Sequence, residues 1–330
     1  MKHGLISVII VNWNGRKWLK KCLSTLQMQS YTKIEIIMVD NASTDDSVEY
    51  VIKNFTRVKI IKNKKNLGLA RANNIGVKHS KGEYLLLINT DVWLEKDFIA
   101  RLLKFFNKNT YDVISPVEKR YTKDESFWFN STIDPTGSPA YFLPTYNKNK
   151  LFFMSVCYFC TKKTYLDTKG FDENHFLYYE DVDWFWRLSL LGKKFSYVED
   201  VFIYHAGAGS TGKGLNYKMF LWRNENALQT LLKNFSLGTL IIILPIYLIQ
   251  NIFEILYFLI TLKPKVAYSY IEGWIFNLRR LNKTLKQRRW IQKRRVVSDI
   301  DILKKMYIGS GKLLLLRTYF QENVLNKSIT

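Results

Sequence analysis

The feature that most constrains the fold is a regular alternation of apolar runs and helical stretches in the first 90 residues. Apolar runs rich in β-branched residues occupy 5–11, 34–39, 58–61 and 85–88, and they predict buried strands. Helices are expected between them, at 18–27, from Ser43 or Thr44 to about residue 54, and from 66 to about 79. This order is typical of a parallel sheet covered by helices on both faces, so the sequence predicts an α/β fold.

Polar residues follow three of these strands at the point where each strand ends. They are Asn12 and Asn14 after the first strand, Asp40 and Asn41 after the second, and Asn89, Thr90 and Asp91 after the fourth. A single cluster of this kind could be a turn after a core strand. The carboxyl ends of parallel strands meet at one edge of a sheet, where ligands bind in open α/β folds. Three polar ends at that edge therefore favour a ligand-binding crevice.

The glycine loops that bind phosphates in dinucleotide-binding and P-loop proteins are absent. No G-x-G-x-x-G follows the first strand, and G-x-x-x-x-G-K-[ST] does not occur. A phosphorylated ligand at this edge would need a metal ion, or arginine and lysine, to balance its charge.

A second concentration of charge lies among aromatic residues between 176 and 188. Glu180, Asp183 and Arg187 have i, i+3, i+7 spacing, which places them on one face of a helix, and Asp181 lies about 100° away. A functional cluster and a capped helix with an internal salt bridge are both consistent with this pattern. A strand is expected at 193–203, and His205 after it is either structural or a ligand.

Composition limits the class of protein and its partners. At 330 residues, 47% of them hydrophobic, the chain can form one large domain with an appendage, or two domains. The net charge of +22 suggests an anionic partner: nucleic acid, a phosphorylated ligand or a membrane surface. Cys157 and Cys160 are predicted to pack within a strand, and with Cys22 they suggest neither a disulfide framework nor a zinc site. No export signal is recognised at the start, so a cytosolic location is expected.

The C-terminal third predicts association with a membrane. Residues 237–262 form an apolar run of 26 residues, long enough to span a bilayer, but Pro245, Gln250, Asn251 and Glu254 interrupt it. A helical hairpin or an in-plane helix in one leaflet is therefore preferred, with a span and a buried core helix as the alternatives. Residues 283–295 hold seven basic residues, which suit an anionic cytoplasmic leaflet. Nucleic-acid binding is disfavoured because no such module is recognisable.

An ordered set of motifs makes the chain resemble a known family. The motifs are SVIIVNWNG, IIMVDNASTDDS, NLGLARANNIG, GEYLLLINTDV, GFDENHFLYYEDVDWFWRL and the final His205. Together they resemble the family-two inverting glycosyltransferases of GT-A fold, and among these the rhamnosyltransferase-like members, over about residues 5–230. The resemblance implies a GT-A-type, Rossmann-like and mostly parallel sheet in residues 1–230. Residues 231–330 would form a helical, basic, membrane-associating region.

The resemblance also implies a chemistry. The enzyme would be a hexosyl- or deoxyhexosyltransferase using a UDP- or dTDP-sugar, with rhamnose among the candidate sugars. A divalent metal, Mg²⁺ or Mn²⁺, would assist departure of the diphosphate. The Asp-x-Asp motif of the family matches Asn89-Thr90-Asp91, which lacks the first carboxylate. Asp91 would be the principal metal ligand, and His205 would complete the site.

Individual roles follow from the matched positions. Asp181 would be the general base that deprotonates the acceptor hydroxyl, with Glu180 beside it. Asp40 matches the residue that hydrogen-bonds the pyrimidine. The remaining donor-binding candidates are Asn12, Asn14, Asn41, Arg71, Asn73, Asn74 and Asn89, with Arg71 meeting the diphosphate. Trp184 and Asp183 are the acceptor-binding candidates, although Trp184 could equally be a core residue.

The expected acceptor is a glycan or a lipid-linked glycan of the cell envelope, at the cytoplasmic face of the membrane. The protein would be peripheral or monotopic, with no nucleic-acid partner. Two alternatives stay open: a non-catalytic nucleotide-sugar-binding scaffold, and a nucleotidyltransferase. The sequence leaves the donor sugar, the linkage, the metal preference and the oligomeric state undetermined.

Overall fold

The structure is a computed structural model in which the chain divides into two compact units. It describes residues 4–120, 127–128, 132–140, 152–154, 156–207 and 217–314. The first unit comprises Met1–Trp128, Met154–Glu180 and Lys193–Gly214. The second comprises Phe129–Phe153, Asp181–Gly192 and Leu215–Thr330. Each unit is described by itself below.

The structure divides the chain differently from the predicted boundary at residue 230, which falls inside helix α7 (Tyr217–Asn234). The second unit also includes most of helix α6 (Glu180–Leu190), which lies far upstream of that boundary. Side-chain packing explains the difference. The ring of Trp186 on α6 meets Phe235, which directly follows α7, at a centroid distance of 4.6 Å. Contacts between segments distant in sequence, and not chain order, define this unit.

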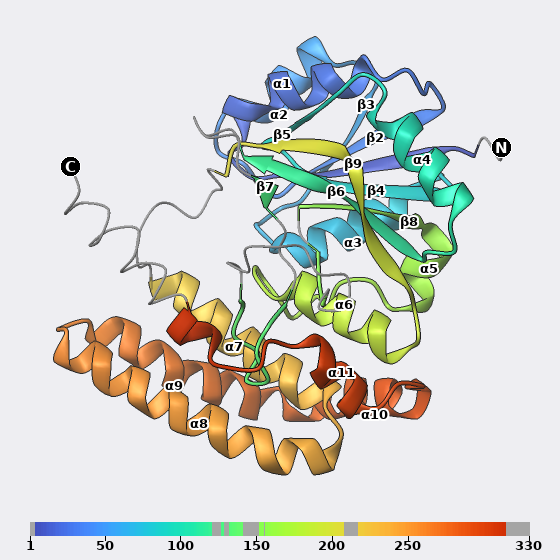
Figure 1. The fold of residues 1–330 in the computed structure, drawn as a ribbon. Helices are drawn as coiled ribbons and strands as arrows, with labels where there is room; N and C mark the ends of the chain where they lie inside the picture. Colours follow the sequence, from blue (N-terminus) through green and yellow to red (C-terminus); the bar gives the residue numbers. More distant parts are fainter. Residues whose placement is uncertain are drawn as a thin grey trace, which may run out of the picture. The chain divides into compact units, whose positions relative to one another are not determined.

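The first unit is built on a mixed sheet (Figure 1). Its strands, as far as the structure describes them, are β1 (Ile6–Asn12), β2 (Ile34–Asp40), β3 (Val58–Lys62), β4 (Tyr84–Asn89), β5 (Val92–Leu94), β6 (Val113–Arg120), β7 (Phe127–Trp128), β8 (Cys157–Thr161) and β9 (Phe195–His205). Their order is β3-β2-β1-β4-β8-β6-β9-β5, with β7 paired to β6.

The four strands predicted from the N-terminal alternation form the parallel half of this sheet. β1 pairs in parallel with both β2 and β4, and β2 with β3. The other half contains antiparallel pairs: β8 runs against β4 and β6, and β5 runs against β9. The predicted α/β class is confirmed, with a mixed sheet in place of a mostly parallel one.

Helices cover both faces of the sheet, as the alternation predicts (Figure 1). They are α1 (Arg16–Gln27), α2 (Ser47–Asn54), α3 (Leu69–His79), α4 (Phe98–Lys108) and α5 (Lys162–Asp167). Alternate residues of β1 serve the two faces. Val8 and Ile10 join the core cluster that contains buried residues of α1 and α4. Ile9 points the other way, where a Cβ on Gly76 of α3 would lie 2.4 Å from its Cγ2.

Two local expectations are refined. Helix α2 begins at Ser47 after Asp46, and neither Ser43 nor Thr44 caps it. The cysteines are free and buried, and Cys157 and Cys160 lie on β8 as packing residues. Burial raises the pKa of the Cys160 thiol, which therefore stays protonated and unreactive.

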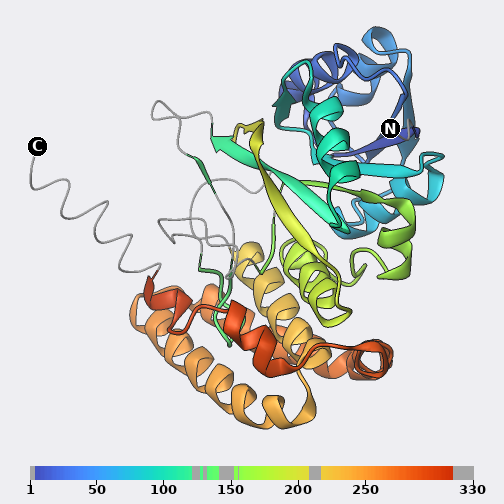
Figure 2. The ribbon, with the colours of Figure 1, turned by 45° about the vertical axis from the view of Figure 1, so that its right-hand side comes forward.

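The described part of the second unit is mostly helical (Figure 2). After α6 and α7 come α8 (Leu237–Ile260), α9 (Pro264–Arg279), α10 (Leu281–Arg294) and α11 (Asp299–Lys305). Pro245 was expected to break the apolar run, but α8 continues through it for 24 residues. Proline removes one backbone hydrogen bond, and the other hydrogen bonds of the helix keep it continuous. α8 is the one described helix that is long and apolar enough to cross a membrane.

Candidate active site

The polar ends of the first, second and fourth strands lie side by side at one edge of the sheet. Asn12 at the end of β1 pairs with Asp40 at the end of β2, and Val11 pairs with Asn89 at the end of β4. The register therefore brings together the residues that the sequence predicted to converge. This edge is where a parallel sheet of this type binds its ligand.

A hydrogen-bond network joins the first two strand ends. Nδ2 of Asn12 donates to Oδ1 of Asp40 at 2.9 Å and to Oγ of Ser43 at 3.0 Å. The Asp40 carboxylate also accepts from the backbone N–H of Ser43. Oδ1 of Asn14 accepts from the N–H of Thr44 at 2.7 Å, which closes the network at its exposed side. Ser43, expected to cap a helix, instead bonds both Asn12 and Asp40 at the ends of β1 and β2.

One acceptor oxygen of these side chains takes no part in the hydrogen-bond network. Oδ1 of Asn12 is buried and has no hydrogen-bond partner among the residues that the structure describes. A Cβ on Gly15 would lie 2.4 Å from that oxygen and 3.2 Å from Oγ1 of Thr90. Glycine at this position allows the backbone to approach the Asn12 side chain closely. A buried acceptor without a protein partner is suited to a hydrogen-bond donor of a ligand.

Asn41, a predicted donor-binding residue, makes hydrogen bonds within the protein at both ends of its amide. Its Nδ2 donates to Oδ1 of Asn66 at 2.8 Å, and its Oδ1 accepts from Nδ2 of Asn63 and from the N–H of Leu67, each at 3.0 Å. These bonds occupy both ends of the amide. Asn41 therefore ties the loop before α3 to the end of β2, and it orders the site without offering a free group to a ligand.

Asn74, another predicted donor-binding residue, also makes hydrogen bonds within the protein. Its Oδ1 accepts from the Tyr165 hydroxyl at 2.7 Å, and its Nδ2 donates to the carbonyl of Phe171 at 2.9 Å. Asn73 is buried and donates to the carbonyl of Leu69 within α3. Arg71 is half-exposed, with its Nε 3.6 Å from the Glu173 carboxylate. Of the α3 candidates, the Arg71 guanidinium is the one presented to solvent.

Gly68 brings the start of α3 against the loop that leads to α6. Its φ of +83° is a conformation that favours glycine, and a Cβ there would lie 2.3 Å from the carbonyl oxygen of Phe176. The next residue, Leu69, donates its N–H to that same oxygen at 2.7 Å. The NLGLA motif thus positions residues 171–180 by direct backbone contact.

Backbone strain marks the end of that loop. Tyr178 and Tyr179 have φ values of 70° and 65°, although neither is glycine. Two consecutive bulky residues in the left-handed region are costly, and such strain gathers at functional sites. Glu180, the first residue of α6, follows directly.

Asp181 begins the part of the chain assigned to the second unit, one peptide bond after Glu180. Its Oδ1 accepts from the N–H of Val182 at 2.7 Å. Desolvation around the carboxyl raises the pKa of Asp181 to about 6, against the opposing effect of that hydrogen bond. A carboxylate with this pKa can accept a proton near neutral pH more readily than an ordinary aspartate.

The two predicted acceptor-binding residues further along α6 are buried in this structure. Asp183 is fully buried, with Oδ1 2.9 Å from Nζ of Lys233 and Oδ2 3.0 Å from Nε of Arg187. Nδ2 of Asn234 donates to it as well. Trp184 is also fully buried. The internal salt bridge weighed at the sequence level is present, and both side chains belong to the core of the second unit.

Asp91 and His205 meet in the first unit as the resemblance implied. β5 pairs with β9, and this pairing brings the segment after Asp91 alongside His205. Oδ2 of Asp91 lies 3.2 Å from Nε2 of His205, and Asp91 is 6% exposed. The carbonyl of Asp91 accepts from the N–H of Ala206, which fixes both chain segments.

Glu118 is a site residue that the sequence analysis missed. It lies on β6, beside β9 in the sheet, and its Oε1 is 2.7 Å from Nδ1 of His205. Burial lowers the pKa of His205, but the carboxylates of Asp91 and Glu118 outweigh it and raise that pKa to about 9. The imidazole is therefore held between two anionic groups.

The Asp91–His205 pair fits a divalent cation. Oδ2 of Asp91 is buried and accepts no well-formed hydrogen bond from the described part of the chain. Adjacent ligands of an octahedral ion with bonds of about 2.1 Å are about 3.0 Å apart, close to the observed 3.2 Å. No group of three His, Cys, Asp or Glu side chains gathers for a metal in the described ranges. This protein would thus supply two ligands, and the ligand phosphates and water the rest.

Comparison with known proteins agrees with this geometry. Residues 7–170 match the sequence family described as Glycosyl transferase family 2. Residues 7–170 are a family 2 glycosyltransferase domain. The chain is 33% identical to the glycosyltransferase GlyG of Streptococcus pneumoniae over 134 residues, covering 39% of this chain and 44% of GlyG.

Solved structures show the same fold. S. aureus TarS 1-349 in complex with UDP-GlcNAc superimposes with a TM-score of 0.52 at 18% identity, covering 70% of this chain and 67% of TarS 1-349. GalNAc-T7 with UDP, GalNAc and Mn²⁺ gives a TM-score of 0.58 at 16% identity, covering 69% of this chain and 47% of that one. The GT-A fold of this glycosyltransferase domain is therefore established, while the chain spans less than half the length of GlyG.

Proposed function

We propose that this protein is an inverting glycosyltransferase that transfers a sugar from a nucleotide diphosphate sugar to a hydroxyl of a glycan or lipid-linked glycan. The observation that carries the proposal is that the first unit, which contains most of the family 2 match, holds both the paired strand ends at Asn12 and Asp40 and the Asp91–His205 contact. TarS and GalNAc-T7 have each been solved with a UDP nucleotide, which supports a UDP- or dTDP-sugar as donor.

Three sets of residues would have separate roles in binding the sugar donor. Asp40 and the buried Oδ1 of Asn12 would receive hydrogen bonds from the base or ribose. Arg71 would contribute positive charge toward the diphosphate. Asp91 and His205 would hold Mg²⁺ or Mn²⁺, which supplies a Lewis acid for the leaving diphosphate.

On the acceptor side, Asp181 would accept the proton of the attacking hydroxyl. Inversion requires the base on the face of the sugar opposite the leaving group. The pKa of about 6 keeps Asp181 largely ionised at neutral pH and basic enough to take a proton. Glu180 would orient the acceptor beside it. The strained Tyr178–Tyr179 backbone supports a functional role for this pair.

The test is a screen of the purified full-length chain against UDP- and dTDP-sugars with Mg²⁺ or Mn²⁺. One donor should bind in the micromolar range and be hydrolysed slowly, with metal required for both. Binding without turnover, even with glycan acceptors, would instead support a non-catalytic scaffold. Release of pyrophosphate from a nucleoside triphosphate would support a nucleotidyltransferase.

A further inference from the structure

We propose that the second unit docks on an anionic lipid bilayer through the outward face of α8, with the helix lying in the plane of one leaflet. The inference stands on the second unit alone and does not depend on the proposed reaction. It identifies which side chains meet the lipid, and it distinguishes an in-plane helix from a span.

α8 has two sharply separated faces. Its buried residues, Leu240, Ile243, Tyr247, Asn251 and Phe258, fall within an arc of about 80° at about 100° per residue. The exposed residues cover about 200° on the other side and are all apolar or aromatic. Ile241, Phe253 and Ile260 are 68%, 67% and 80% exposed. An uninterrupted apolar surface of this width on a helix marks an interaction site.

The polar residues that interrupt the sequence run do not interrupt this surface. Gln250, Asn251 and Glu254 lie within about 100° of one another, on the covered side of the helix. Asn251 is buried, and Glu254 forms an ion pair with Lys312. The charge that made a membrane span costly is therefore turned away from the outward face.

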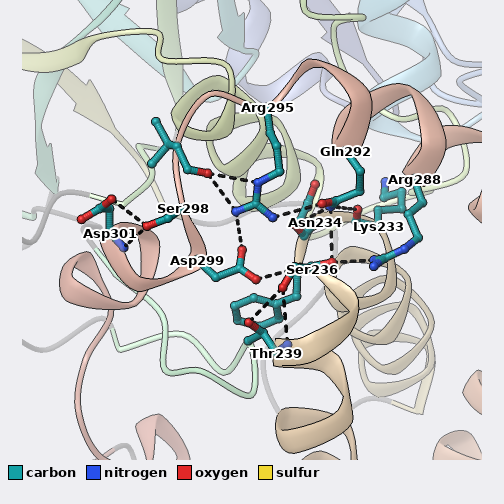
Figure 3. A network of polar contacts seen from close by, with 12 residues as sticks. Lys233, Asn234, Ser236, Thr239, Arg288, Gln292, Arg295, Ser298, Asp299 and Asp301 are labelled. Carbon is teal, nitrogen blue, oxygen red and sulfur yellow. Dashed lines mark hydrogen bonds and ion pairs between the residues drawn. The ribbon is translucent and has the colours of Figure 1, made fainter.

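The start of α8 is firmly fixed to the rest of the unit (Figure 3). Arg288 donates to the carbonyls of Leu232 and Phe235 at 2.7 and 2.5 Å, which satisfies the end of α7. The N–H of Ser236 donates to Asp299 at 2.7 Å, and Arg295 holds that carboxylate. A rigid helical element thus presents the apolar face.

Positive charge flanks the apolar face. Residues 263–295 contain eleven lysines and arginines and one glutamate. Lys286, Arg289 and Lys293 are exposed at i, i+3, i+7 spacing, so they share one face of α10. A hollow of about 410 Å³ brings Arg289 together with Leu237 and Leu285, at the start of α8. Basic groups beside exposed apolar side chains complement an anionic headgroup above its acyl chains.

The in-plane orientation follows from α9. This helix forms a hairpin with α8, where Phe258 packs with Val266 and Tyr270. Its 16 residues span about 24 Å, with charged residues at 263–265 and 279–280. A hydrocarbon core is about 30 Å thick, so a spanning hairpin would place charged residues inside it. A hairpin in the interface leaves every charge in water or among headgroups.

A second copy of this chain is a poorer occupant of the same surface. One partner helix covers a stripe of roughly 100°, about half of the outward arc. A symmetric contact would also bring together two segments with a net charge of +10 each, counted from eleven basic residues and one acidic residue. An anionic bilayer matches both the width and the charge.

Flotation of the full-length chain with vesicles tests the proposal in the absence of nucleotide. Binding should be strong to phosphatidylcholine with 30% phosphatidylglycerol and at least tenfold weaker to phosphatidylcholine alone. The triple variant Ile242→Gln/Ile249→Gln/Phe253→Gln should lose at least tenfold in binding. Its matched control removes three exposed apolar side chains elsewhere in the unit: Val296→Gln/Ile300→Gln/Ile308→Gln. Equal binding by both triple variants would overturn the proposed surface.

A second pair of triple variants tests the contribution of basic side chains to vesicle binding. Lys286→Gln/Arg289→Gln/Lys293→Gln should abolish the preference for anionic vesicles. Lys20→Gln/Lys53→Gln/Lys64→Gln removes equal charge from exposed positions of the first unit and should retain the preference. A stable dimer in light scattering that dissociates in the α8 variant, without vesicle binding by the parent, would assign the surface to a second copy and overturn the proposal. Donor binding, measured separately, reports on the proposed reaction.

Depth measurements test the orientation. A fluorophore on Ile241→Cys, Ile249→Cys or Ile260→Cys is compared in reconstituted vesicles with quenchers at known depths. The native cysteines are at most 1% exposed, so labelling should be confined to the introduced site. Equal shallow depths at all three positions would support the in-plane helix. A label at Ile249 much deeper than both ends would show a span and overturn it.

Discussion

Oε1 of Glu118 lies 2.7 Å from Nδ1 of His205, while Oδ2 of Asp91 lies 3.2 Å from Nε2 on the opposite side of the same ring. The ring is therefore oriented from behind by one carboxylate and presented to the other. In metal sites, a carboxylate behind a histidine fixes the tautomer and the direction of the ligating nitrogen. We therefore propose that Glu118 is a positioning residue that acts through His205.

Glu118→Gln is expected to weaken Mn²⁺ binding by about 10- to 100-fold, because the neutral amide holds the imidazole less firmly. Titration of Mn²⁺ by electron paramagnetic resonance, with and without UDP, measures this without relying on turnover. Glu95→Gln is the control, since Glu95 accepts from Tyr204, next to His205, without touching the imidazole. Similar losses in the two variants would show that general charge near β9, and not ring orientation, sets the affinity.

Asp91→Ala tests the other side of the ring. Loss of this carboxylate should remove the metal-dependent part of donor binding, at least about tenfold in Kd, because one of two protein ligands is gone. Calorimetry with the nucleotide sugar, in Mn²⁺ and in chelator, separates that part from the rest. Asp97→Asn, an exposed carboxylate that pairs with Arg101, should leave both values unchanged. Identical affinities in metal and in chelator for the parent protein would contradict the assigned role.

Asp181→Asn should reduce transfer by about 10³-fold while the Kd of the nucleotide changes little, because the amide cannot accept a proton. Steady-state kinetics measures the rate of transfer, and calorimetry on the same preparation measures the Kd of the nucleotide. Asp167→Asn, on the surface of α5, provides the matched loss of one carboxylate. Turnover near that of the parent protein would eliminate Asp181 as the base.

The pH dependence follows from the same group. The base works only when ionised, so kcat/KM should rise with pH through the pKa of about 6 and level off above it. An ordinary aspartate would have completed this rise below about pH 5. The residual activity of Asp181→Asn should lack the rising limb. If the rise of kcat/KM with pH persists unchanged in Asp181→Asn, it arises from a titrating group other than Asp181.

The sequence predicted that the polar strand ends converge, because local patterns determine these strands. The first, second and fourth strands of the parallel half end in polar residues, and a parallel register brings such ends together without further information. Glu118 was not predicted, because no local pattern in the sequence indicates its position. It lies on β6, in a proline-rich stretch without clear periodicity, and only the pairing with β9 brings it near His205.

Asp183 and Asn74 show a second limit. Both are polar residues inside motifs of the family, and residue type alone does not distinguish a ligand-binding group from one satisfied by the protein. The partners are distant in sequence: Lys233 for Asp183, and Tyr165 for Asn74. Pro245 was expected to interrupt a helix, but α8 continues through it. One missing hydrogen bond in a helix of 24 residues is outweighed by the other hydrogen bonds of that helix.

Gly68→Ala tests the link between α3 and the loop before α6. The methyl group would meet the Phe176 carbonyl at 2.3 Å, and φ of +83° is strained for alanine. A loss of about 1–3 kcal/mol in the free energy of unfolding is expected. Gly238→Ala is the control, because nothing lies within 4 Å of its Cβ position in α8 and alanine favours helix. Equal stability of the two variants by denaturant unfolding would contradict the close approach.

Lys233→Met tests whether Asp183 serves the fold or the acceptor. Nζ of Lys233 is buried 2.9 Å from Asp183, so its removal takes one cation away from a buried carboxylate that keeps its contacts with Arg187 and Asn234. Removing one partner of a buried pair costs about 3–5 kcal/mol, and the remaining partners place the expected loss near the lower value. Lys304→Met breaks an exposed pair with Asp301 and should cost less than about 1 kcal/mol. Denaturant unfolding measures both, and donor affinity in the folded Lys233→Met protein should match the parent. A small change in stability together with a raised KM for the acceptor would instead support an acceptor-binding role for Asp183.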